Sequence, residues 1–154
     1  MSKSLGNFFI LRDVLAEYPA EMLRYFLIAS HYRSPIHYSQ ENLQSAHAAL
    51  QRLYTSLHGL LSAKAQRDDY SNVVNEYQKK FRAAMDDDFN TPDALAVLFE
   101  IVREINRLRE TDFQKAVLLA QFLKEQASVL GILQQDPDQF LKASLKDDNA
   151  EKIE

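Results

Sequence analysis

The stretch from Asn90 to Leu108 reads NTPDALAVLFEIVREINRL, and it decides the fold class. Its apolar residues recur at intervals of three and four positions, the pattern of an amphipathic α-helix with one buried face. Asn90 or Thr91 can cap this helix, and Pro92 fits its first turn because a missing N–H costs nothing there. The outer face predicts two ion pairs, Glu100 with Arg103 and Glu104 with Arg107.

The same periodicity predicts further helices on both sides of this stretch. They cover residues 8–18, 20–30, 39–61, 71–85 and 111–130. Ser39 is the expected cap of the third, Thr111 and Gln114 form a capping box for the last, and Gly131 ends it. After Pro137 we expect only one helical turn, followed by a polar, frayed tail over residues 143–154.

Composition supports an all-α fold with one core. The chain has 154 residues, of which 46% are hydrophobic, with only three Gly and four Pro. This size suits a single domain, and the long Ala-, Leu- and Glu-rich runs favour helix. We predict a loop and short helical segment over residues 1–38, an antiparallel helical bundle over 39–134, and a short turn and tail over 135–154.

Charge and residue usage exclude several function classes. Residues 1–65 carry six Lys or Arg against four Asp or Glu, whereas residues 66–154 carry twelve against eighteen. A strongly basic nucleic-acid footprint is therefore absent, and any RNA contact should be a local patch, most plausibly in the first half. No cysteine is present, so we propose neither a disulfide nor a thiolate metal site. Without a long apolar run or a basic-then-apolar leader, we expect a cytoplasmic chain without a membrane segment.

Two clusters invite a metal interpretation. Three adjacent aspartates lie within MDDDFNTP at residues 85–92, but adjacent side chains do not converge on one ion, so a helix cap is the preferred interpretation. The four histidines lack a spacing that would bring two onto one face beside a second ligand set: His31, His37, His47 and His58. We therefore predict no metal site.

The first seven residues, MSKSLGN, carry the clearest chemical signal. Lys3 stands between Ser2 and Ser4, and Gly6 with Asn7 gives the backbone freedom for a turn. A lysine on such a loop can meet a phosphate as a point charge, while serine hydroxyls and loop amides add hydrogen bonds. Taken alone, the same residues also suit a frayed terminus.

Further motifs accompany this loop: RDVL at 12–15, LRYFL at 23–27, HYRSP at 31–35 and MDDDFNTP at 85–92. Together they resemble the class I aminoacyl-tRNA synthetases, and the cysteinyl-tRNA synthetase family very closely, from residue 1 to about residue 141. The opening is similar to the lysine-methionine-serine-lysine-serine signature of that family, without its first lysine. Ile10 departs from the Thr usual in the family and cannot cap the first helix, which leaves Asn7 as the expected cap.

The resemblance implies ATP-dependent ligation of cysteine to tRNA. Lys3 would then be a catalytic residue that neutralises charge on the transferring phosphates, and Ser2 and Ser4 would help to bind ATP. The family binds zinc through cysteine and histidine residues of its catalytic domain, so no zinc is expected on this chain. Because the nucleotide-binding domain is not in these residues, we expect the chain alone to be inactive, and we expect a monomer.

The HYRSP segment corresponds to the stem-contact region of the family, which joins the catalytic domain to a helical tRNA-binding bundle. Tyr32 and Arg33 would meet RNA by stacking and by charge, with buried packing of Tyr32 as the alternative. Arg24 is a third candidate for tRNA contact, and a solvated or salt-bridged position is its alternative. Asp93-Ala94-Leu95 matches three letters of the Asp-Ala-Leu-Arg signature after which this bundle is named.

Two other functions fit parts of the sequence. A related ligase joins cysteine to an amino sugar with the same loop, but the long bundle and the 85–92 stretch argue against it. A helical interaction module without catalysis is the second alternative, and the acidic second half of the chain supports it.

Overall fold

The computed structural model describes residues 10–65 and 70–151 of the chain. Within these residues it contains helices joined by loops, and no strand. They are α1 (Leu11–Glu17), α2 (Ala20–Ile28), α3 (Gln40–Leu57), α4 (Tyr70–Asp86), α5 (Thr91–Leu108), α6 (Phe113–Val129) and α7 (Pro137–Glu151). The predicted all-α fold class is confirmed. None of these helices has the length and apolar character needed to cross a membrane.

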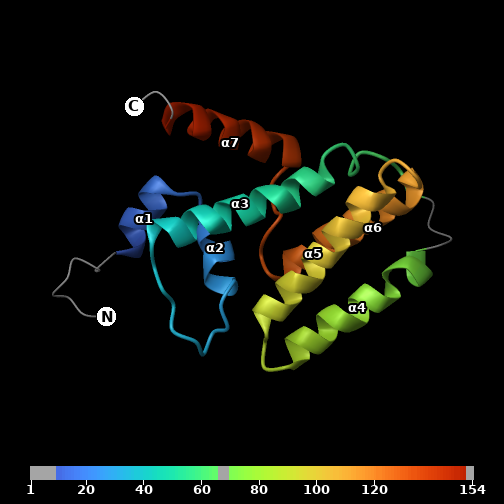
Figure 1. Ribbon diagram of the computed structural model, residues 1–154, viewed down its shortest axis with the longest axis horizontal. Coiled ribbons are helices and arrows are strands. Elements are labelled where there is room, and N and C mark those ends of the chain that lie inside the picture. The colour runs from blue at the N-terminus through green and yellow to red at the C-terminus, as the bar shows by residue number, and fades with distance from the viewer. Residues whose placement is uncertain (1–9, 66–69, 152–154) are drawn as a thin grey trace.

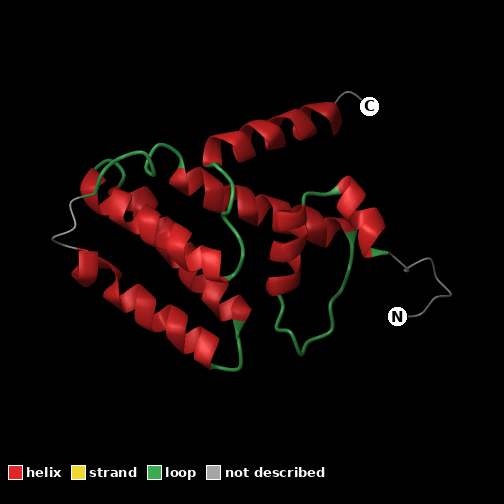
Figure 2. Ribbon diagram, turned by 180° about the vertical axis from the view of Figure 1, so that it is seen from behind, coloured by secondary structure: helices red, strands yellow, loops and turns green. Residues whose placement is uncertain are grey.

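Two groups of helices pack against each other. The helices α4, α5 and α6 contact one another and lie side by side in Figure 1. The long helix α3 packs against α5, and it carries α2 and α7 on other parts of its surface. The view from behind shows the same grouping, with the loop after α2 on the side of the α4–α5 turn (Figure 2). Helix α2 therefore packs directly on α3.

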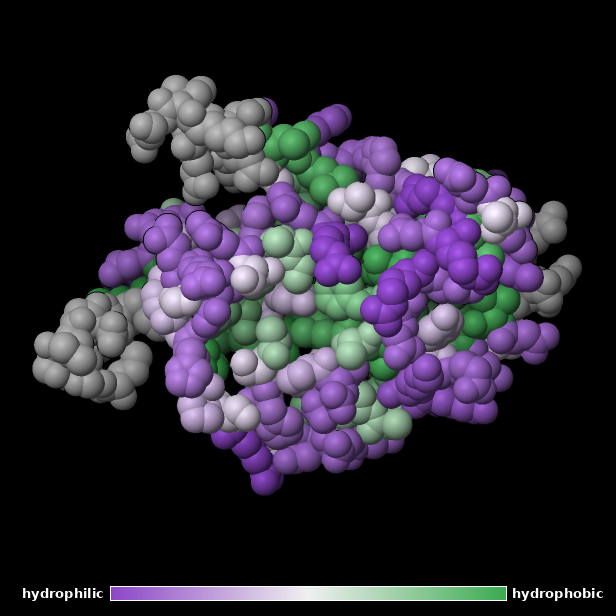
Figure 3. All heavy atoms as spheres, in the orientation of Figure 1, coloured by the Kyte–Doolittle hydropathy of each residue, from purple (hydrophilic) through white to green (hydrophobic). Residues whose placement is uncertain are grey.

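One continuous core joins the two groups. Its largest fully buried side chains come from α3, α5 and α6 and from the turn after α3: Tyr54, Phe122, Leu43, Leu50, Leu53, Leu57, Leu60, Leu98, Ile101, Ile105, Leu119 and Leu123. Burial of such side chains supplies the main favourable free energy of folding. Hydrophilic residues cover much of the face shown in Figure 3, and hydrophobic atoms show between them.

Helix caps explain where several elements begin. The Ser39 hydroxyl accepts the Asn42 amide at 3.0 Å, and the Asn90 side chain accepts the Asp93 amide at 3.2 Å, so both predicted caps are confirmed. The predicted Thr111 cap is wrong by one residue. Asp112 is the N-cap of α6 and accepts the Lys115 amide at 3.2 Å. A carboxylate satisfies an orphan N–H and also favours the positive end of the helix dipole.

The ends of α3 and α6 follow from two glycines. Gly131 has φ +72°, the Ile132 amide bonds to the Ala127 carbonyl, and this Schellman arrangement closes α6 as expected. Helix α3 ends at Leu57 rather than at the predicted residue 61, because Gly59 has φ +75° and turns the chain. Arg109 then donates to the carbonyls of Ser56 and His58, each at 2.8 Å.

The first helix begins later than predicted, and the second begins as predicted but ends earlier. Helix α1 starts at Leu11 instead of residue 8, with Ile10 at its N-cap and no side-chain cap bond. The predicted cap Asn7 lies outside the described residues. Pro19 is the N-cap of α2, and this helix ends at Ile28, two residues short of the prediction.

The C-terminal prediction of one helical turn and a frayed tail is wrong. Residues 137–151 form a single helix of fifteen residues that packs against α3. Its anchor is Phe140, whose ring stacks on Tyr54 with centroids 4.0 Å apart. His58 Nδ1 lies 2.6 Å from the Asp138 carboxylate and adds a second tie to α3. Tertiary packing therefore stabilises a helix that the polar sequence alone did not suggest.

Ion pairs on α5 partly follow the prediction. Arg107 Nε donates to Glu104 at 2.9 Å, so this predicted pair is confirmed. Glu100 bonds to Lys80 of α4 at 2.9 Å instead of Arg103. Both pairs are solvent-exposed, where such interactions contribute little to stability.

Candidate functional site

The two most distinctive described stretches of the sequence, residues 31–35 and 85–92, meet in space. The Tyr32 hydroxyl donates to Asp88 Oδ1 at 2.7 Å, and Arg33 Nε lies 3.1 Å from Asp88 Oδ2. Arg33 Nε also donates to the Tyr32 hydroxyl at 3.0 Å. His31 Nε2 is 3.0 Å from the Asp88 carbonyl oxygen. Asp88 therefore holds the whole His31–Arg33 segment through its side chain and its backbone.

Helix geometry explains why the chain brings these groups together. After α4, Asp88 and Phe89 have φ of 53° and 51°, a left-handed conformation that costs a non-glycine residue about 1–2 kcal/mol. The Asn90 amide bonds to the Ala84 carbonyl, and the Thr91 hydroxyl donates to the Ile28 carbonyl at 2.7 Å. The second bond fixes the start of α5 against the end of α2. The turn then presents Asp88 towards the loop that follows α2.

Arg33 is held at one end only. Its Nε is used by Asp88 and Tyr32, whereas its terminal guanidinium nitrogens make no hydrogen bond to the described residues. The side chain is 68% exposed. A guanidinium presents paired donors that match a phosphate, and here its orientation is set by the Nε contacts. The arrangement suits an anion that approaches from solvent.

Aromatic surface lies beside this cation. The rings of His31 and Tyr32 stack with centroids 4.8 Å apart, and Tyr32 is 59% exposed. The Arg33 guanidinium carbon lies 5.5 Å from the centre of the Tyr32 ring. Exposed aromatic rings beside arginine are the usual means by which proteins stack on unpaired RNA bases. The exposure of Tyr32 excludes the alternative that it is buried, whereas its contact with RNA stays a prediction.

The Asp88 carboxylate also changes the acidity of its partner. Its hydrogen bond raises the pKa of the Tyr32 phenol, and Arg33 partly opposes this effect. At neutral pH the phenol therefore keeps its proton and acts as a donor to Asp88.

An apolar hollow of about 510 Å³ lies next to this cluster, between α2, the loop after it and the start of α5. It is lined by Leu27, Ile28, Ser30, Tyr32, Ile36, Phe89 and Thr91. Phe89 is 64% exposed although its backbone is in the strained left-handed region. Strain of this kind is found where a side chain must be presented for function.

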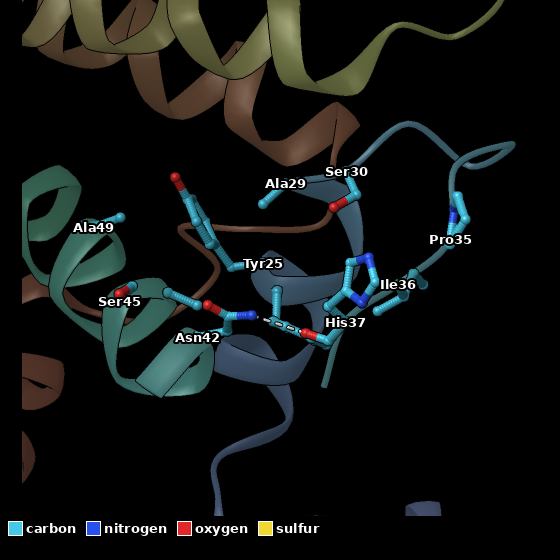
Figure 4. A pocket seen from close by; sticks show the side chains of 11 residues that line it. Tyr25, Ala29, Ser30, Pro35, Ile36, His37, Asn42, Ser45 and Ala49 are labelled. Carbon is cyan, nitrogen blue, oxygen red and sulfur yellow. Dashed lines mark hydrogen bonds between the residues drawn. The ribbon is translucent and has the colours of Figure 1, made fainter. Parts of the chain in front are cut away.

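A second hollow, of about 400 Å³, separates α2 from the first turns of α3. Figure 4 shows Tyr25, Ser30 and His37 around it and the bond from the Asn42 side chain to the His37 carbonyl, at 2.9 Å. Of the residues that line it, only Tyr25 and His37 can titrate, and no hydrogen bond joins their side chains. This hollow therefore offers shape without an evident acid–base pair.

The remaining predicted site residues have different outcomes. Ser2, Lys3 and Ser4 lie outside the described residues, so their predicted roles stay predictions. Arg24 is exposed, as its alternative of a solvated position expects, and its guanidinium donates to the Gly131 carbonyl, so its contact with tRNA stays a prediction. Among residues 10–65 and 70–151, no group of three or more His, Cys, Asp or Glu side chains is placed to hold a metal ion.

Sequence reasoning treated the three aspartates only as a helix cap and missed the role of Asp88. The signal was present in outline, because His31-Tyr32-Arg33 offers donors and Asp88 offers an acceptor. No local rule pairs segments 56 positions apart, however. Phe89 was also missed as a candidate, since its exposure depends on the left-handed turn.

Known families match two parts of the chain. A family model described as the catalytic domain of class I (C) tRNA synthetases matches residues 1–48, and a DALR domain model matches residues 80–134. The first of these includes the loop motif and His31–Arg33, and the second includes Asp88 and α5. Both matches point to the class I aminoacyl-tRNA synthetases.

Similarity to curated proteins narrows the class. The chain is 55% identical over 157 residues to a cysteine–tRNA ligase of Haemophilus influenzae, strain PittGG, and 57% identical over 155 residues to that of Shewanella sediminis. The Shewanella oneidensis ligase is 54% identical over 154 residues. Each alignment covers 100% of this chain and 32% of the relative, so the chain spans about a third of their length. Together with the two family models, these identities support the assignment of the chain to the cysteinyl-tRNA synthetases.

Proposed function

We propose that this chain is the part of a cysteine–tRNA ligase that carries the phosphate-binding loop and the helices that face tRNA. The observation that carries the proposal is the 53–57% identity to cysteine–tRNA ligases over the whole chain or nearly all of it. The reaction would be the ATP-dependent attachment of cysteine to tRNA through a cysteinyl-adenylate. A ligase that serves protein synthesis would act in the cytoplasm.

Lys3 is the residue we assign to the chemical step. An ammonium held on the MSKSLGN loop would neutralise negative charge that develops on the ATP phosphates during adenylate formation. Ser2 and Ser4 would contribute hydroxyl donors to the same phosphates. The chain has no cysteine, so we assign no zinc to it and derive no step through a metal.

Tyr32 and Arg33 are the residues we assign to tRNA contact. The terminal nitrogens of Arg33, which make no hydrogen bond to the described residues, suit a backbone phosphate. The exposed Tyr32 ring suits an unpaired base or a sugar edge. Asp88 orients both side chains, so it supports the contact without touching RNA. Arg24 is the weakest of the three predicted contacts because its guanidinium is already bonded to Gly131.

A chimeric ligase tests this function directly. In the Haemophilus influenzae enzyme, the matching third is replaced by this chain, and cysteine charging of tRNA is measured. We expect charging, and we expect Lys3→Ala to slow adenylate formation far more than Lys142→Ala, a control at an exposed lysine of α7. A folded chimera that transfers cysteine to an amino sugar but not to tRNA would establish the alternative ligase. A folded chimera without either activity would support the interaction module.

A further inference from the structure

A buried carboxylate that the proposed function does not use lies on α2. Glu21 is 5% exposed, and no cationic side chain among the described residues pairs with it. Taking a carboxylate out of water is unfavourable unless hydrogen-bond donors replace the water. The burial of Glu21 must therefore be explained by the hydrogen-bond donors that surround it.

Four hydrogen bonds surround this carboxylate, and their donors lie in two parts of the chain, α3 and residues 134–135. The Tyr54 hydroxyl of α3 donates to both oxygens, at 2.8 and 2.7 Å. The Gln134 amide donates to Oε1 at 3.2 Å, and the Gln135 side chain donates to Oε2 at 3.0 Å. The Gln135 amide in turn donates to the Tyr54 hydroxyl at 3.1 Å. Glu21 and Tyr54 thus take up both backbone N–H groups of residues 134–135.

A second side chain of α2 binds the segment between α6 and α7. Arg24, one turn after Glu21, donates to the Gly131 carbonyl. Its Cδ lies where a side chain at position 131 would stand, since a Cβ added to Gly131 would be 2.9 Å from this atom. Glu21 and Arg24 together bind residues 131–135, which connect α6 to α7. An apolar contact would allow sliding, whereas these directional bonds fix one register.

The sequence places this junction between two regions with different assigned tasks. Helices α1 and α2 follow directly on the loop that carries Lys3, and residues 131–135 follow directly on the last helix of the α4–α6 group. We infer that Glu21 is a positioning residue that makes α2 and residues 131–135 move as one body. Engagement of tRNA by the bundle then sets the position of the segment that bears Lys3. The effect on the segment that bears Lys3 rests on the proposed function, whereas the coupled movement of α2 and residues 131–135 does not.

Hydrogen exchange on the chain tests the mechanical part. In Glu21→Gln, an amide NH2 group replaces one carboxylate oxygen. This group cannot accept the hydrogen bonds that residues 134 and 135 donate to Glu21. We expect the Gln134 and Gln135 amides to exchange roughly tenfold faster or more, as for a lost local bond. Glu17→Gln, an exposed acid on α1, is the control and should change nothing. Unchanged exchange at residues 134–135 in a folded Glu21→Gln chain would overturn the inference.

Kinetics of the chimeric ligase test the consequence. We expect Glu21→Gln to lower kcat for charging by roughly tenfold to a hundredfold, the scale of a small misplacement of a catalytic group. The tRNA dissociation constant should stay within about twofold, because Glu21 does not face RNA. The double variant Glu21→Gln with Gln135→Glu restores one bond with donor and acceptor exchanged, and it should recover much of kcat. A merely structural role would not give this split.

The outcomes separate the two proposals. If the unsubstituted chimera does not charge tRNA, the proposed function fails, and the exchange experiment alone decides whether Glu21 joins α2 to residues 131–135. If the chimera charges tRNA but Glu21→Gln leaves kcat unchanged, the positioning role is wrong and the function stands. Where Glu21→Gln does not fold, Tyr54→Phe removes one donor while keeping the ring against Phe140, and the same readouts apply.

Discussion

Tyr32 donates a 2.7 Å hydrogen bond to the Asp88 carboxylate across a sequence separation of 56 residues. The bond joins the loop after α2 to the turn between α4 and α5, so it connects the segment matched by the catalytic-domain model with the segment matched by the DALR model. Arg33 shares the same carboxylate at 3.1 Å. The orientation of both candidate tRNA contacts therefore depends on one acidic residue in a strained turn.

Asp88→Asn should lower the pKa of Tyr32 towards its ordinary value of 10, because the carboxylate bond is the main cause of its elevation. A pKa raised in the folded state favours folding fully below pH 10, and this contribution is lost as pH rises through the folded value. Asn keeps the tolerance for the left-handed backbone. The measurement is absorbance titration of each protein minus its Tyr32→Phe counterpart. An unchanged difference titration would refute the coupling.

Gly131→Ala should destabilise the protein more than Gly59→Ala. Both glycines have φ above +70°, so each substitution carries the backbone cost of about 1–2 kcal/mol for a left-handed alanine. Around Gly59 there is open space, whereas the new methyl at position 131 would meet Arg24 Cδ at 2.9 Å. Displacing Arg24 also breaks its bond to the Gly131 carbonyl, adding about 1 kcal/mol. Urea unfolding of both variants checks the order, and equal losses would contradict it.

Local sequence signals predicted the elements whose causes are local. The Ser39 and Asn90 caps were predicted because their hydrogen bonds span three residues, and the apolar period of α5 gave its buried face. The α6 cap was misplaced because Thr111 and Asp112 both suit the position by propensity. Geometry selects Asp112, whereas the Thr111 hydroxyl bonds back to the Arg107 carbonyl at 3.3 Å.

Contacts between segments far apart in the chain could not be predicted from the sequence, and the reason is physical. Helix α7 was missed because its stability comes from Phe140 stacking on Tyr54 and not from a strong amphipathic period. The Asp88 cluster and the Glu21 junction were missed because each joins segments more than thirty residues apart. Tyr32 and Arg33 were identified through a motif, but their shared acceptor was not. A motif names residues, and only the fold supplies their partners.

Tyr54→Phe should destabilise the chain by about 1–3 kcal/mol, the usual cost of leaving a buried polar group without a partner. The substitution keeps the stack on Phe140 but removes a donor to Glu21 and an acceptor for the Gln135 amide. Tyr25→Phe is a matched control, because Tyr25 is also a buried tyrosine of the core. Chemical denaturation measures both, and a Tyr54→Phe loss no larger than the control would refute the polar role.

Alkaline pH should weaken the same junction. Burial, helped by the Glu21 bond, raises the pKa of Tyr54 well above its ordinary value of 10. Because the folded pKa lies above the unfolded one, the contribution to stability is complete below pH 10 and is lost as pH rises towards the folded value. Stability measured from pH 8 to 11 should therefore fall less steeply in Tyr54→Phe than in the unsubstituted chain.

Asp112→Ala should lower the melting temperature, whereas Thr111→Ala should change it little, because Asp112 is the N-cap of α6. The bond from the Lys115 amide lowers the pKa of Asp112 below its ordinary value of 3.8. This contribution is present above pH 3.8 and is lost as pH falls through the folded pKa. The difference between Asp112→Ala and the unsubstituted chain should therefore shrink in acid. A larger effect of Thr111→Ala would restore the original cap assignment.

In the chimeric ligase, substitutions of Lys3 and Arg33 should impair different steps, because Lys3 is assigned to the ATP phosphates and Arg33 to tRNA. Lys3→Ala should slow adenylate formation and leave the tRNA dissociation constant nearly unchanged. Arg33→Ala should weaken tRNA binding and reduce the slope of log affinity against log salt by about one, as expected for one lost phosphate contact. Arg107→Ala is the control, because this arginine is paired with Glu104 on the outer face of α5. If the salt slope of the Arg33→Ala enzyme is unchanged, Arg33 does not belong to the RNA interface. If both substitutions affect both steps equally, Lys3 and Arg33 do not have separate roles.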